Sequence, residues 1–216
     1  MVEQESSGKA KKALIEKIRT MLPSLSIFSG LSIVIVYVAF LTISYALHPS
    51  GFSPIDNWLS DLGKYSVNTN GAIYYNAGCI LTGIFLALFA AVLQIKGSMK
   101  KWQHIFIIIS QLSGIVAGFG LVMTAIFSID QLQLHSTWGI VMKFGLVYFI
   151  TFLSVALIPK PRFYRIIGIF GLANVAIEMI YNLAANTPIM EWISIFGALA
   201  FVAVFTIFTT VNKKPE

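Results

Sequence analysis

The sequence predicts an all-α integral membrane protein with six transmembrane helices and a short interfacial helix in the first outer loop. Of its 216 residues 57% are hydrophobic, and the mean hydropathy is +0.81. Only 11% are charged, whereas soluble domains carry about 25%. Long apolar runs recur along the chain, and together these observations exclude a soluble globular domain.

Six apolar runs have the length of a membrane-spanning helix. A helix rises about 1.5 Å per residue, so roughly 20 apolar residues cross a hydrocarbon layer of about 30 Å. Each run is long and free of turn signals, which favours helices over strands. The predicted spans are 25–47, 72–95, 104–128, 137–158, 166–185 and 192–212.

Lysine and arginine predict the orientation of these spans. Thirteen of the fifteen basic residues fall on one side of the predicted membrane, whereas Lys64 alone falls in the opposite loops. Because positive loops stay in the cytoplasm, we expect a multi-pass protein of the cell membrane with both termini cytoplasmic. The thirteen are Lys9, Lys11, Lys12, Lys17, Arg19, Lys96, Lys100, Lys101, Lys160, Arg162, Arg165, Lys213 and Lys214.

The chain then divides into an arm (1–24), a six-helix domain (25–212) and a tail (213–216). In the arm, apolar residues recur at helical spacing opposite lysines, which is typical of a helix on an anionic membrane surface. A solvated basic tail that only fixes orientation explains the arm equally well. The orientation bias also explains the net charge of +6, so we predict no nucleic-acid partner.

Between the first two spans, residues 54–62 show the pattern of a short amphipathic helix. Ser53 suits the N-cap and Pro54 the first helical position, and Asp56 falls where a capping acid stands. Asp61 falls in the last turn, where the helix dipole disfavours an anion. Either Lys64 screens Asp61, or Asp61 turns into a polar pocket between the outer helix ends.

Other polar residues are predicted at the same outer depth. Asn76 enters the second span, and Asp130 and His135 bracket the third outer loop, while His48 closes the first span. Carboxylates and imidazoles are ligands that suit zinc, but no HxxxH or HExxH pairing places them on one helix face. We therefore predict a ligand pocket without a metal site and without a cofactor.

Two charges, Lys143 and Glu178, lie inside predicted spans, where each costs about 2.5 to 3.5 kcal/mol. Counted from the predicted span ends, they lie about 9 and 12 Å below the outer surface. The two charges neutralise each other, or Lys143 reaches up to the interface. Alternatively, one of them binds a headgroup or moves a proton.

An S-D-L-G motif stands at residues 60–63. It is followed along the chain by Asn76 and Gly78, by an F-x-x-D motif at residues 127–130, and by His135. This order resembles a prokaryotic six-helix integral membrane family catalogued as a domain of unknown function. It is distantly similar to the FRAG/DRAM/Sfk-type family, which is associated with lysosomal membranes and lipid-anchor remodelling. The resemblance implies that Asp61, Asn76, Asp130 and His135 belong to a family site.

We therefore predict an outward-facing polar pocket that binds or modifies the headgroup of a membrane lipid. Its ligand-binding residues are Asp61, Asn76, Asp130, His135, Lys143 and Glu178. In the binding version Lys143 and His135 meet a phosphate, and in an enzymatic version His135 is the general base. The alternatives are a transporter of small solutes or protons that uses Lys143 and Glu178, and a scaffold. The sequence does not indicate an oligomeric state.

Overall fold

The structure is a computed structural model that describes residues 2–49, 51–95, 97–184 and 187–211, and these residues contain helices but no strand. All six long helices are long and apolar enough to cross a membrane, which confirms the predicted fold class. They are α1 (Val2–Leu47), α2 (Ala72–Val92), α3 (Lys101–Ile126), α4 (Leu132–Leu157), α5 (Arg162–Ala184) and α6 (Pro188–Val211). Two short 3-10 helices, η1 (Leu59–Gly63) and η2 (Ile129–Gln131), lie in the connections.

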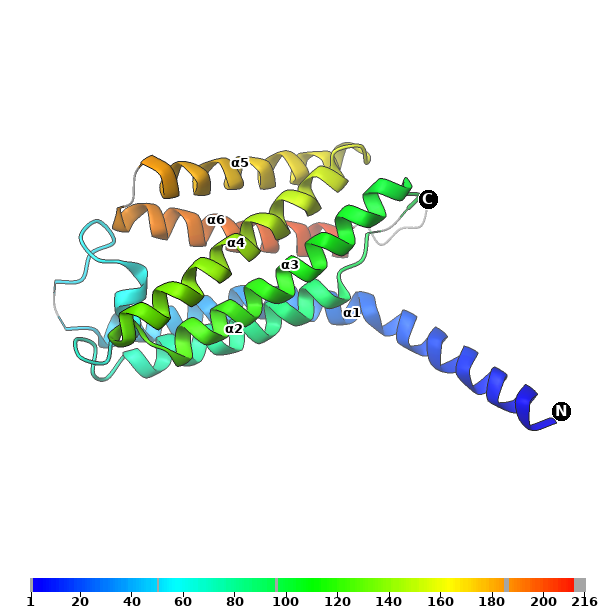
Figure 1. Ribbon diagram of the computed structural model, residues 1–216, viewed down its shortest axis with the longest axis horizontal. Coiled ribbons are helices and arrows are strands. Elements are labelled where there is room, and N and C mark those ends of the chain that lie inside the picture. The colour runs from blue at the N-terminus through cyan, green and yellow to red at the C-terminus, as the bar shows by residue number, and fades with distance from the viewer. Residues whose placement is uncertain (1, 50, 96, 185–186, 212–216) are drawn as a thin grey trace.

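The bundle has two different ends. At one end lie η1, η2 and the start of α6, and we call this the η1 end. At the other lie the arm, the α2–α3 and α4–α5 connections and the end of α6, and we call this the basic end. In Figure 1 the η1 end is on the left, and α1 extends beyond the bundle at the basic end.

The interfacial helix predicted over residues 54–62 is not confirmed. Residues 54–57 form a turn closed by the Asn57 amide, which donates to the Ser53 carbonyl at 2.8 Å. Only Leu59–Gly63 is helical, as η1. Leu59 and Leu62 are buried, whereas Ile55 remains 71% exposed. The apolar residues that suggested one amphipathic helix therefore belong to two structures, the turn at 54–57 and the helix η1.

The long helices pack in sequence order, and α6 returns to α1, so the six form a closed ring. Small residues let some neighbours approach closely. A Cβ on Gly118 would lie 2.5 Å from the Gly83 carbonyl of α2, and one on Gly114 would lie 2.6 Å from the Ala90 Cβ. The Ser110 hydroxyl of α3 donates to the Phe149 carbonyl of α4 at 2.9 Å. Ser110, Gly114 and Gly118, spaced by four along α3, therefore lie at close contacts between helices.

Aromatic side chains fill the interior of the ring toward the basic end. Phe89 of α2 lies at the centre, with its ring centroid 6.3 Å from that of Phe149 in α4 and 6.0 Å from that of Phe205 in α6. All three are at most 1% exposed. We call these three residues the phenylalanine plug.

At the basic end, the Lys160 ammonium group donates to the Ser98 carbonyl at 2.8 Å, which ties the α4–α5 connection to the α2–α3 connection. Burial lowers the pKa of Lys160 below its usual value. The predicted arm continues into the first span as one helix, α1. The side chains of residues 1–15 and the tail at 213–216 lie outside the described part of the chain.

Candidate functional site: a deep cavity at the η1 end

The interior of the ring is hollow toward the η1 end. A cavity of about 550 Å³, which we call the main cavity, is lined by residues of α1, η1, α2, α3, α4 and α6. Its deepest lining residues include Ile33, Leu86, Leu146 and Val202, each fourteen residues from the end of its helix at the η1 end. Fourteen residues span about 21 Å, so the cavity extends well into the bundle.

The phenylalanine plug closes the cavity from below. Phe89, Phe149 and Phe205 each lie three residues, or one helical turn, beyond the lining residues Leu86, Leu146 and Val202. The main cavity is therefore closed toward the basic end and open toward the η1 end.

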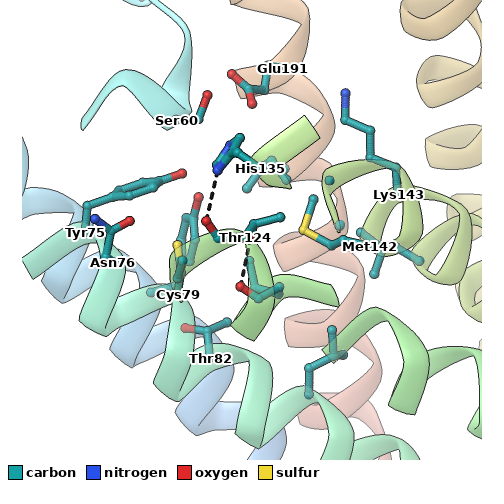
Figure 2. Close-up of a pocket in the computed structure, with 18 of the residues that line it drawn as sticks. Ser60, Tyr75, Asn76, Cys79, Thr82, Thr124, His135, Met142, Lys143 and Glu191 are labelled. Carbon is teal, nitrogen blue, oxygen red and sulfur yellow. Dashed lines mark hydrogen bonds between the residues drawn. The ribbon is translucent and has the colours of Figure 1, made fainter. Parts of the chain in front are cut away.

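Polar side chains gather at the mouth of this cavity. Figure 2 shows Ser60, His135 and Glu191 directed toward one another, with Lys143 reaching up from α4 beside them. Tyr75 and Asn76 line the same region from α2. The deepest part is apolar, so the cavity is amphipathic along its length.

His135 is held in one tautomer by the end of α3. Its Nδ1 atom lies 2.9 Å from the Thr124 carbonyl and 3.0 Å from the Phe127 carbonyl, and both oxygens can only accept. Nδ1 therefore carries the proton and satisfies carbonyl groups that are otherwise unpaired at a helix C-terminus. In the neutral ring, Nε2 is left as an acceptor at the cavity wall.

Glu191 lines the main cavity, although the sequence did not predict it as a site residue. Its carboxylate, at the start of α6, accepts the Leu59 amide at 2.7 Å and also interacts with the Ser60 amide. Lys143 acts on the same carboxylate as a nearby positive charge. Glu191 therefore joins η1 to α6 across a sequence separation of 132 residues.

Lys143 lies deeper along its helix than the predicted span implied. Because α4 begins at Leu132, Lys143 is eleven residues into the helix, or about 16 Å rather than 9 Å. Side chains on a helix lean toward its N-terminus, which for α4 is the η1 end. The long side chain thus brings its charge toward the mouth (Figure 2).

The S-D-L-G motif holds η1 against the bundle. Leu62 is fully buried, and the Asn76 side-chain amide of α2 donates to the Gly63 carbonyl at 2.9 Å. A Cβ on Gly63 would lie 2.6 Å from the Asn76 Oδ1 atom and 2.8 Å from the Tyr75 ring. Glycine therefore permits the close approach of η1 to α2.

Asp61 and Asp130 do not line the cavity, although both were predicted site residues. The Asp61 carboxylate accepts the Trp58 amide at 3.0 Å, so it stabilises the beginning of η1. The expectation of an unfavourable helix end was wrong, because Asp61 lies in the first turn of η1. Asp130 accepts the Tyr65 and Ser66 amides at 2.7 and 3.2 Å and anchors the same loop to η2.

Glu178 does not line the main cavity. Together with Lys143 and Asn174 it lines a small cavity of about 30 Å³ between α4, α5 and α6. Direct pairing of Lys143 with Glu178 stays a prediction. Of the six predicted residues, three (Asn76, His135 and Lys143) line the main cavity.

The remaining chemistry of the site is that of binding groups. Within the described residues no three His, Cys, Asp or Glu side chains come together as metal ligands. Cys79 is a free, buried thiol in the cavity wall. The mouth offers a cation, a carboxylate, an imidazole and hydroxyls, which suit a polar or zwitterionic headgroup.

Comparison with known proteins gives a family but no activity. The chain belongs to the family described as "Protein of unknown function (DUF998)", whose pattern matches residues 30–211. The predicted membership of a family of unknown function is thereby confirmed. No curated protein and no solved structure matches the chain.

Proposed function

We propose that this DUF998 protein binds a membrane lipid in the main cavity, with the headgroup at the mouth and an acyl chain in the apolar part. The observation that carries the proposal is the amphipathic shape of the cavity. Its volume of about 550 Å³ falls within the range of small-molecule sites, about 300 to 1,000 Å³. Its depth of about 21 Å exceeds half of a hydrocarbon layer, about 15 Å.

The polarity of the wall follows that of a lipid. A headgroup needs charged or hydrogen-bonding partners, which Lys143, His135, Ser60 and Glu191 offer at the mouth. The hydrocarbon of an acyl chain needs none, and Ile33, Leu86, Leu146, Leu199 and Val202 offer none at depth. A small hydrophilic solute would leave the apolar part of the cavity unfilled, so the shape favours an amphiphile.

Each mouth residue then has a role in this proposal. The Lys143 ammonium group attracts a phosphate, and His135 Nε2 accepts a headgroup hydroxyl or, when protonated, donates to the phosphate. Glu191 suits an ammonium or hydroxyl group of the headgroup. Asn76, Asp61 and Asp130 contribute indirectly, since they hold the loop that carries Ser60.

A cavity-filling variant tests the proposal. Leu86→Trp places an indole in the apolar part, whereas Leu81→Trp on the same helix places it on the exposed surface. Native mass spectrometry of the purified protein should show a retained lipid for wild type and for Leu81→Trp, and at least tenfold less for Leu86→Trp. Ala198→Phe, which fills the cavity from α6, should act like Leu86→Trp. Equal retention in all four proteins would refute lipid binding in this cavity.

Transport of a small solute or of protons is the second proposal, and the small cavity that joins Lys143 to Glu178 supports it. Uptake into proteoliposomes that is lost in Glu178→Gln would favour it. Transport requires a path past the phenylalanine plug, so this proposal also predicts a second conformation.

The cellular setting belongs to the same proposal. The distribution of basic residues supports a cell membrane with cytoplasmic termini, which would place the main cavity in the outer leaflet. The S-D-L-G motif supports, as a further proposal, the distant relationship with FRAG/DRAM/Sfk-type proteins.

A further inference from the structure

The walls of the main cavity are not equally closed. On the α1 and α2 side the lining residues Ile33, Cys79 and Leu86 are at most 5% exposed. On the α4 side Ile140 lines the same cavity but is 56% exposed. A residue that lines a cavity and is more than half exposed marks a place where the cavity reaches the protein surface. The main cavity is therefore open along α4.

The helices α4, α5 and α6 are loosely packed in their halves near the η1 end. None of the residues 132–144 of α4, 172–180 of α5 and 187–198 at the start of α6 is buried. By contrast, α2 has buried residues from its first residue, Ala72, onward. In Figure 1 the start of α4 lies apart from α5 and α6, whereas its end joins α5 through a short connection. The three helices thus diverge toward the η1 end.

The opening that results lies between α4 and α6. Direct packing between these two helices is at most marginal, because α4 packs against α3 and α5 while α6 packs against α5 and α1. We call the gap the side opening and define it by four residues of the cavity wall, Ile140 and Lys143 of α4 and Glu191 and Ile195 of α6. Toward the basic end it is covered by α5, which lines the small cavity next to it.

The side opening lies at the depth of the hydrocarbon layer. The membrane span that contains α4 is Ile129–Leu157, and Ile140 is the twelfth of its 29 residues. Eleven residues correspond to about 16 Å along a helix, or half of a hydrocarbon layer of about 30 Å. A side chain near the middle of a span faces acyl chains or protein. The side opening therefore connects the main cavity with the hydrocarbon of the bilayer.

Entry along the bundle axis is restricted by η1. Trp58 and Ser60 line the cavity from that end. The loop that carries them is hydrogen-bonded to α2 through Asn76, to α6 through Glu191 and to η2 through Asp130. A lipid that arrived along the axis would also expose its acyl chain to water, and the burial of each methylene group would be lost on the way. Sideways entry avoids both obstacles.

We infer that the main cavity takes up its lipid sideways from the hydrocarbon layer, through the side opening, while η1 stays in place. The inference rests on the proposed lipid binding and adds the source of the ligand and its route. On this route the headgroup passes Lys143 and Glu191, and the acyl chain passes Ile140 and Ile195.

The test measures how fast bound lipid exchanges with surrounding lipid. The full-length protein is loaded with deuterated phosphatidylethanolamine in detergent and transferred to mixed micelles that contain an excess of the unlabelled lipid. Native mass spectrometry at timed intervals then gives the fraction of bound lipid that still carries the label.

Side-chain size at the side opening should control this rate. Ile140→Ala and Ile195→Ala widen the opening and should speed exchange several-fold, whereas Ile140→Trp should slow it by about tenfold, since changes at one interface act mostly on dissociation. Phe144 is the matched control, because it lies on the same helix, is 58% exposed and lines neither cavity. Phe144→Ala and Phe144→Trp should leave the rate unchanged.

The outcomes separate the two proposals. If wild type retains no labelled lipid, lipid binding itself is refuted. If wild type retains lipid but the Ile140 and Ile195 variants exchange it at the wild-type rate, lipid binding stands and the side opening is refuted as the route. Equal rate changes in the Phe144 variants would refute it as well. Ile140→Ala only shortens an exposed side chain, so it decides the question even if Ile140→Trp does not fold.

Discussion

Replacing Gly63 by alanine tests whether η1 is held against α2 by close contact. Gly63 does not have a positive φ, so the backbone conformation itself accepts alanine. The new methyl group would meet the Asn76 Oδ1 atom at 2.6 Å and the Tyr75 ring at 2.8 Å, both inside van der Waals contact. Either η1 or these α2 side chains must move.

The cost follows from two contributions. Inserting a methyl group into a packed contact costs about 1 to 3 kcal/mol. Moving Asn76 also breaks its hydrogen bond to the Gly63 carbonyl, at 2.9 Å, for about 1 kcal/mol more. We therefore expect Gly63→Ala to lower the free energy of unfolding by about 2 to 4 kcal/mol.

Titration with SDS in mixed micelles, followed by tryptophan fluorescence, measures this difference. Gly139→Ala is the control, because a Cβ there meets only Thr124 Cγ2, at 4.0 Å. It should keep or raise stability, since alanine is favoured over glycine in a helix by about 1 kcal/mol. A Gly63→Ala protein within about 0.5 kcal/mol of wild type would refute the close-contact argument.

Three further predictions concern orientation, charge and capping. Ser66→Cys should react with an impermeant thiol reagent in intact cells, and labelling only after lysis would reverse the proposed orientation. Lys143→Met and Glu178→Gln should each lower thermal stability in detergent, by at most about 3 to 5 kcal/mol, and the double variant should lose less than the sum; additive losses would reject direct pairing. Asp61→Ala should cost about 1 kcal/mol through the lost Trp58 contact, whereas Asp61→Asn should cost much less because an amide oxygen also accepts. Thermal unfolding that shows equal losses for the two Asp61 variants would contradict the capping role.

The six spans could be predicted from sequence because membrane crossing depends on local length and composition. Lys143 and Glu178 could be identified as unusual for the same reason, since a charged residue inside an apolar run is recognised from the neighbouring sequence alone. The polar residues Asn76 and His135 were found from their place near the outer helix ends, and both line the main cavity.

The loop before α2 could not be predicted in this way. The spacing of apolar residues suggested one helix over 54–62. However, the Glu191 carboxylate, far away in sequence, accepts a hydrogen bond from the Leu59 amide at the start of η1. The role of Glu191 at the mouth was missed for the same reason, because the contact that reveals it depends on the return of α6 to the ring. A pairing of acidic residues with backbone amides leaves no periodic signal in the sequence.

The phenylalanine plug makes the two ends of the bundle different, because it closes the main cavity toward the basic end only. Because Phe89, Phe149 and Phe205 close the ring below the cavity, a lipid bound there as proposed would exchange with one monolayer only. The amount of ligand bound would then report the composition of that monolayer, whatever lipids the opposite one contains. A protein built in this way could sense a difference between the two halves of a bilayer without moving any lipid across it.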